Sequence, residues 1–102
     1  YLVYEIISDA HFAEPYRINE EIRKSMRSFS GEIDLGRAGL YFLNKKFDTN
    51  KQRGMLRVEN NMLDRLKGSL TLVDTVDGNK AILKSVGVSG ILKKAEKNYI
   101  NS

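Results

Sequence analysis

Basic side chains gather near the end of the sequence, where a predicted strand runs directly into a predicted helix. The segment KSVGVSGILKKAEK, residues 84–97, contains a single acid and four lysines: Lys84, Lys93, Lys94 and Lys97. Ser89 stands where it could cap the helix. The apolar face of this helix would consist of Ile91, Leu92, Ala95 and Tyr99. Lysines held beside a sheet can neutralise the phosphates of a nucleic acid, and each such contact steepens the salt dependence of binding by roughly one unit.

Arginines form a second basic set on two predicted central strands. We expect strands over residues 35–47 and 53–59, joined by a turn at residues 48–51. Because side chains alternate along a strand, this pairing places three arginines on the sheet face away from the core: Arg37, Arg53 and Arg57. A solvated strand face would also carry arginines, but their alignment on adjacent strands favours a binding role.

The second of these strands partly matches an RNA-binding motif. That motif begins with a basic residue and a glycine, as Arg53-Gly54 does here, and Val58 matches a later position. Met55 and Arg57 stand where the motif has its stacking aromatics. We therefore expect this face to recognise the phosphates and the shape of folded RNA, without stacking single bases.

Residues that could support catalysis by the chain itself are sparse. The single histidine, His11, lies in a predicted loop, and Glu20-Glu21 fits the first turn of a helix capped by Asn19. The sequence GVSG at residues 87–90 lacks the spacing of a nucleophile elbow, and the glycines form no phosphate-loop pattern. We expect no catalytic residue, and no metal or cofactor bound by the protein.

The order of the predicted elements indicates the fold. Around the two central strands, apolar patterning predicts a first strand, two helices and a last strand at residues 1–8, 19–31, 60–73 and 79–86. In the first strand, Leu2, Tyr4 and Ile6 should point to one face, and Val3 and Glu5 to the other. Glu5, the only charge in this strand, should be partly open or paired with a cation. This order predicts an α+β, ferredoxin-like (RNA-recognition-motif-like) single domain over residues 1–102: a four-stranded antiparallel sheet with two helices on one face and an extra C-terminal helix.

Composition limits the class of protein further. The chain has 102 residues, which suits one domain, and 17 Lys and Arg against 13 Asp and Glu give a net charge of +4. No apolar run is long enough to span a membrane, and the lack of cysteine is compatible with a reducing compartment, so we expect a cytoplasmic protein. Because the sequence begins at Tyr1 rather than at a methionine, we expect a few residues to precede it.

Four stretches together resemble a known family. YLVYEIIS, GRAGLYFLN, RGMLRVEN and KSVGVSGILKKAEK are similar to ribonuclease P protein component 2, a small archaeal subunit with eukaryotic relatives. The resemblance implies a ferredoxin-like subunit of the ribonucleoprotein that removes the 5′ leader from precursor tRNA. It implies that the RNA subunit is the catalyst, with bound magnesium, and that precursor tRNA is met only indirectly. It also implies pairing with protein component 3, so that the two proteins support the catalytic RNA alongside the other ribonuclease P proteins.

Two other functions fit the same predicted fold. A regulatory or small-ligand-binding domain could hold an anion or metabolite near Ser89-Gly90, at the start of the last helix. An acylphosphatase-like enzyme would need a glycine-containing phosphate cradle after the first strand, and residues 8–14, SDAHFAE, contain no glycine. The RNA-binding subunit is therefore the leading hypothesis, and the ligand-binding domain is its alternative.

Overall fold

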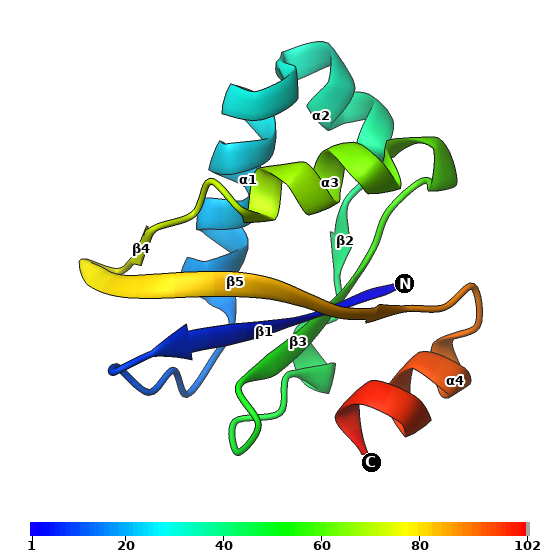
Figure 1. Cartoon of the computed structure of the whole chain (residues 1–102). Helices are drawn as coiled ribbons and strands as arrows, with labels where there is room; N and C mark the ends of the chain where they lie inside the picture. Colours follow the sequence, from blue (N-terminus) through cyan, green and yellow to red (C-terminus); the bar gives the residue numbers. More distant parts are fainter. Residues whose placement is uncertain (102) are drawn as a thin grey trace.

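A computed structural model describes residues 1–101 of the chain. The helices pack around one antiparallel sheet (Figure 1). In chain order the elements are β1 (Leu2–Ser8), α1 (Tyr16–Ser30), α2 (Glu32–Ala38), β2 (Tyr41–Phe42), β3 (Arg53–Arg57), α3 (Leu63–Leu70), β4 (Thr75–Val76), β5 (Asn79–Val88) and α4 (Leu92–Ala95). Short 3₁₀ turns lie at Asn44–Lys46 and Asn60–Met62, and a π-helical turn at Glu96–Ile100 continues α4. We call residues 92–100 the C-terminal helix.

The sheet has five strands in the order β2-β3-β1-β5-β4, so the prediction of four strands was wrong. The additional strand, β4, forms a hairpin with β5. Its two-residue turn is Asp77-Gly78, in which both residues have positive φ, as a hairpin turn of this type requires. Without β4 and the short helix α2, the chain keeps the predicted order of strand, helix, two strands, helix and strand.

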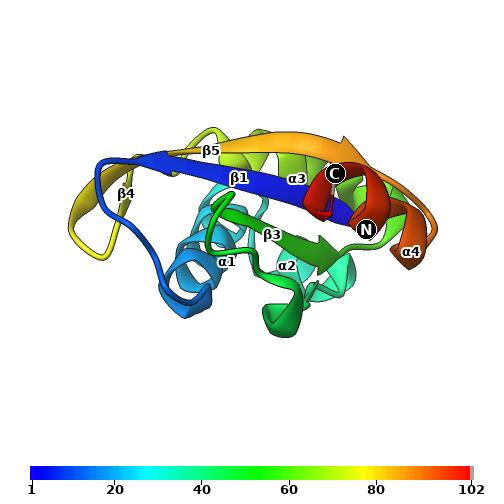
Figure 2. The same ribbon diagram turned by 90° about the horizontal axis from the view of Figure 1, so that it is seen from below.

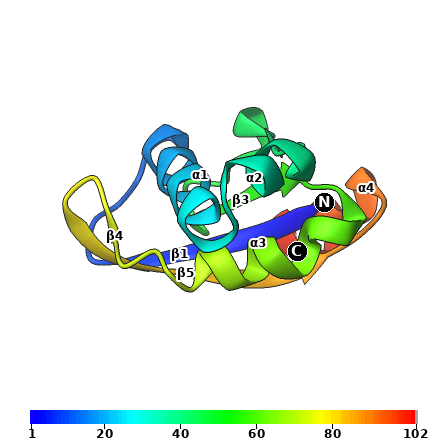
Figure 3. The same ribbon diagram turned by 90° about the horizontal axis from the view of Figure 1, so that it is seen from above.

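One face of the sheet packs against α1 and α3, and these helices lie over β1 and β5 (Figure 3). Alternation along β1 points Leu2, Tyr4 and Ile6 into this layer, as predicted. They meet apolar side chains at helical spacing, chiefly Ile18, Ile22, Met26, Leu66 and Leu70. Each such buried side chain stabilises the fold by about 1.5–3 kcal/mol, so this layer is the main core.

Residues 35–47 do not form the long strand that the sequence predicted. Most of the first half belongs to α2, and only Tyr41–Phe42 pairs with β3. Gly31 and Gly39, both with positive φ, set the limits of α2, and its first turn carries acids that complement the helix dipole. Arg37 therefore lies in the last turn of a helix, and its predicted place on the sheet face was wrong.

The two long helices also begin elsewhere than predicted. α1 starts at Tyr16, after Pro15, and Asn19 is buried within it rather than capping it. The Asn19 side chain instead donates a hydrogen bond to Asn44 Oδ1 (2.7 Å), which ties α1 to the segment after β2. The helix predicted from residue 60 begins only at Leu63, after a 3₁₀ turn at Asn60–Met62. A capping preference is local, and at Asn19 the contact with Asn44 overrode it.

Candidate nucleic-acid interface

The C-terminal helix covers part of the second face of the sheet, opposite α1 and α3 (Figure 2). Its buried residues, Ala95 and Ile100, pack against Val3 of β1 and Met55 of β3. Partly buried apolar side chains surround this contact: Tyr1, Leu43, Val86, Leu92 and Tyr99. The apolar side of the predicted helix, apart from the half-exposed Ile91, therefore closes this end of the sheet face.

A glycine on β5 permits the helix to sit this close. A Cβ atom at Gly87 would lie 2.1 Å from Cζ of Tyr99, well inside van der Waals contact. The tyrosine ring thus occupies the space that any other residue at this position would fill. Ser89, which follows, does not cap the helix: its hydroxyl accepts a hydrogen bond from the backbone of Ile91 (3.1 Å) in a local turn before Leu92.

Three cations fasten the end of the C-terminal helix to the sheet side of the molecule. Arg53 donates one hydrogen bond to Glu5 Oε1 (2.9 Å) and another to the carbonyl of Tyr99 (2.8 Å). Lys51 donates to the carbonyl of Ile100 (2.6 Å). Lys46 forms an ion pair of 3.0 Å with Glu96. Carbonyls at a helix C-terminus lack partners within the helix and carry negative partial charge, so Arg53 and Lys51 stabilise the docked end. Lys46 adds an ion pair in the middle of the helix.

Arg53 is thereby committed to protein contacts. Its side chain is only 25% exposed, and its guanidinium already holds Glu5 and the helix end. The expectation that Glu5 would meet a cation is confirmed. The RNA-binding role of Arg53 stays a prediction, and the structure assigns this arginine a clear packing role beside it.

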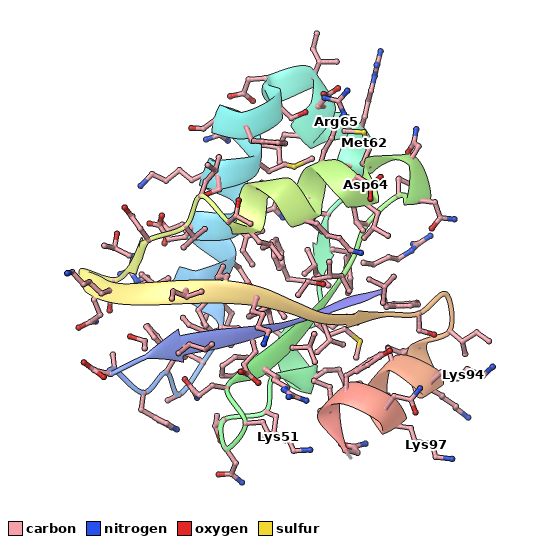
Figure 4. The ribbon with its side chains drawn as sticks, in the orientation of Figure 1. Lys51, Met62, Asp64, Arg65, Lys94 and Lys97 are labelled. Atoms are coloured by element: carbon pink, nitrogen blue, oxygen red, sulfur yellow. The ribbon has the colours of Figure 1, made fainter. Side chains whose placement is uncertain are left out.

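The lysines of the C-terminal helix face away from this contact. Lys93, Lys94 and Lys97 are all exposed, and the labelled Lys94 and Lys97 point outward from the sheet (Figure 4). Within residues 1–101, none of the three forms an ion pair. We call these residues the lysine face. It is held rigidly because its helix is packed on one side and fastened at its end.

The remaining predicted residues divide between the two sides of the sheet. Arg57, at the end of β3, and Lys84, on β5, are exposed and share the sheet face that carries the C-terminal helix. Lys84 lies opposite Glu5 in the β1–β5 ladder. Arg37 lies on α2, which packs against α1 in the other layer (Figure 3). The structure therefore brings Arg57, Lys84 and the lysine face to one side and leaves Arg37 apart.

Sequence reasoning missed two exposed tyrosines at the edge of the sheet. Tyr16 on α1 is 56% exposed and Tyr41 on β2 is 64% exposed, and both line a cavity of about 520 Å³. Tyr41 could have been recognised from the sequence only if β2 had been assigned correctly, because the strand pairing decides which residues lie beside Tyr41. Tyr41 stands directly opposite Arg57 in the β2–β3 ladder, so an aromatic residue and a cation are neighbours.

The groups considered for catalysis have local structural roles. His11 Nε2 lies 2.9 Å from the carbonyl of Thr49, which joins two loops, and Glu20 pairs with Arg17 at 3.2 Å. No cluster of three or more His, Cys, Asp or Glu side chains suited to a metal occurs in residues 1–101. Of the helices in this part of the chain, none has the length and apolarity needed to cross a membrane.

These features define a small basic α+β module that presents cations from a helix clamped to its sheet. The model of the Rpp14/Pop5 family matches residues 1–100, and the chain belongs to this family. Ribonuclease P protein component 2 of Pyrococcus furiosus is 33% identical over 101 residues, which cover 99% of this chain and 82% of that protein. The proteins of the same name from Thermococcus gammatolerans and Archaeoglobus fulgidus are 28% and 29% identical, each over 98% of this chain and over 81% and 86% of the relative. The resemblance drawn from the sequence is confirmed.

Proposed function

We propose that this chain is a protein subunit of ribonuclease P, the ribonucleoprotein that matures the 5′ end of tRNA. Membership of the Rpp14/Pop5 family and relatives named ribonuclease P protein component 2, matched over nearly the whole chain, support this proposal. In this proposal the fold is ferredoxin-like with an added β4 hairpin, and the protein works in the cytoplasm of an archaeal cell. The alternative, a regulatory small-ligand domain, is not favoured, because Ser89 is engaged in a local turn at the place where it needed an anion site.

In this proposal the subunit contributes no reacting group. The RNA subunit, with magnesium, carries the chemistry, and this chain stabilises it together with protein component 3 and the other ribonuclease P proteins. Precursor tRNA is met through the assembled RNA.

One observation carries the proposed mode of RNA contact: the lysine face stands on a helix whose opposite side is packed and whose end is fastened by Arg53, Lys51 and Lys46. Flexible lysines on a mobile tail would also attract phosphates. A clamped helix holds them at fixed separations from Arg57 and Lys84, so the arrangement can recognise the spacing of phosphates in folded RNA.

A charge-matched pair of variants tests this contact. The first changes Lys94→Gln and Lys97→Gln, and the control changes Lys24→Gln and Lys67→Gln on α1 and α3, which removes the same charge from the opposite layer. Affinity for ribonuclease P RNA is measured over a range of salt concentrations with a constant magnesium concentration. We expect the first variant to reduce the slope of log affinity against log salt by about 1.4–1.8, and the control to leave it unchanged.

If both variants lose the same amount of slope, RNA binding depends only on the net charge of the protein, and the lysine face is not a specific site. An unchanged slope in the first variant would also exclude the lysine face as a site. Reconstituted cleavage of precursor tRNA tests the subunit role separately. We expect the wild-type chain, added together with protein component 3, to lower the magnesium concentration that the RNA needs for cleavage. If cleavage in that mixture is the same with and without this chain, the proposed function is overturned.

A further inference from the structure

We propose that the cavity between α1 and the edge strand β2 binds one unpaired nucleotide of the RNA, with its base stacked against tyrosine. This inference rests on the proposed function and extends it from phosphate contact to a site for a single base. The cavity, of about 520 Å³, opens between the first half of α1 and the segment around β2. An adjoining cavity of about 450 Å³ shares Tyr16 and Tyr41 with it, so the two tyrosines stand between two open spaces.

The tyrosines are not needed by the core. Both rings are more than half exposed, and neither belongs to the two apolar clusters that hold the fold together. Neither hydroxyl takes part in a hydrogen bond within residues 1–101. Exposed aromatic rings beside cations are the surface on which single-stranded nucleic-acid binders stack bases.

Cations lie around this aromatic site, and they are available to bind a phosphate. Arg23 lies 5.0 Å above the ring of Phe42 and forms no ion pair in residues 1–101, and Lys45 is exposed on the rim. Arg57 stands opposite Tyr41 in the strand ladder and on the same sheet face. A nucleotide whose base meets Tyr41 can therefore place its flanking phosphates near Arg57 or Lys45.

One acid in the cavity fixes which part of the nucleotide enters. Glu20 lines the cavity wall on α1, where its Oε2 accepts a hydrogen bond from Arg17 (3.2 Å) and its Oε1 can accept one from an exocyclic amine or ring N–H of a base. The base therefore points inward and the phosphates stay on the rim. A base inside an A-form helix keeps both of its faces stacked and cannot enter, so the ligand is a bulged or looped nucleotide.

Position in the sheet makes the site accessible to a large ligand. β2 is the outermost strand and pairs only with β3, so its outer edge is not covered by another strand. The site also joins the side that carries Arg57, Lys84 and the lysine face. A folded RNA that lies along these cations therefore reaches the two tyrosines with a nearby loop or bulge.

The test uses the full chain and two RNA hairpins that share the same paired stem. One hairpin carries a single bulged 2-aminopurine, and the other lacks the bulge and is fully paired. We expect the wild-type protein to quench the bulged fluorophore and to bind the bulged hairpin about tenfold more tightly than the paired one. The double variant Tyr16→Leu and Tyr41→Leu should lose the quenching and this preference while it keeps its affinity for the paired hairpin. The double variant Tyr16→Phe and Tyr41→Phe keeps both rings and should retain the preference.

The outcomes separate the site from the function on which it rests. If the wild-type protein binds both hairpins and the leucine variant keeps the preference for the bulge, the nucleotide site is overturned and the RNA-binding function stands. If the wild-type protein binds neither these hairpins nor ribonuclease P RNA, both proposals are overturned. If the protein quenches free 2-aminopurine riboside monophosphate as strongly as it quenches the bulged hairpin, the cavity is a mononucleotide site and its assignment to RNA is overturned. Circular dichroism of the leucine variant, expected to match the wild type because both rings are exposed, shows that the fold is intact.

Discussion

Replacing Arg53 separates a structural arginine from an RNA-binding one. The change Arg53→Gln removes its charge and both of its hydrogen bonds, to Glu5 and to the carbonyl of Tyr99. A fully buried pair broken from one side costs about 3–5 kcal/mol, and an exposed pair about 0–1 kcal/mol. With the two side chains 25% and 27% exposed, the pair lies between these limits, and we expect a loss of about 2 kcal/mol in the free energy of unfolding.

Urea unfolding at neutral pH measures this loss, which should move the midpoint by about 1 M for a chain of this size. Arg53→Lys keeps the charge but cannot direct two fixed N–H groups at both acceptors, so it should recover only about half of the loss. A double-mutant cycle with Glu5→Gln should give a coupling of about 1 kcal/mol. Amide exchange should rise in residues 92–100 more than in β1, because the helix end loses its anchor.

The same variant is then tested with ribonuclease P RNA under conditions where it is folded. We expect the salt slope of binding to change by less than that of the Lys94 and Lys97 variant, because the guanidinium of Arg53 is occupied by protein groups. A structural role for Arg53 is excluded if Arg53→Gln leaves the urea midpoint unchanged and reduces the salt slope by about one unit. That result would make Arg53 an RNA contact, as the sequence alone suggested.

Three further changes test the packing of the fold. Gly87→Val places a side chain where the ring of Tyr99 lies, so we expect about 1–3 kcal/mol of destabilisation and faster amide exchange in the C-terminal helix, whereas Gly90→Val, with open space around its Cβ position, is the matched control. Gln52→Ala removes the side chain that bonds both backbone groups of Phe12 (2.9 Å each), and urea unfolding should show a loss of about 2 kcal/mol. Burial raises the pKa of Tyr4, so its contribution to stability is present below the unfolded pKa of about 10 and lost as the pH rises above it. Urea titrations at increasing alkaline pH should therefore show a smaller fall in stability for Tyr4→Phe than for the wild type.

Patterns within a short stretch of sequence were enough to predict much of the fold. The alternation of Leu2, Tyr4 and Ile6 against Val3 in β1 depends only on the pleat of a strand, and the structure shows both faces as predicted. The helical spacing of Ile18, Ile22 and Met26 likewise gave α1. The exposed lysines of the C-terminal helix followed from local composition, and the family resemblance covered the same segments.

Where two local patterns fitted one stretch, the sequence could not choose between them. Residues 32–38 fit both a helix and an alternating strand, and the positive φ of Gly31 and Gly39, together with packing against α1, decided for a helix. That choice moved Arg37 away from the sheet. Asn19 had the composition of a cap, but a partner from residue 44 drew it into the interior.

The sequence by itself determined that a basic helix follows the last strand, that this helix has an apolar side, and that side chains along the first strand alternate between the two faces of the sheet. Only the tertiary structure decided what those surfaces meet. The C-terminal helix closes one end of the sheet face because Gly87 leaves room for Tyr99 and because Arg53 reaches the helix end from a distant strand. The aromatic cavity of Tyr16 and Tyr41 also exists only after α1 and β2 are brought together. Such contacts join residues far apart in the chain, and no local preference encodes them.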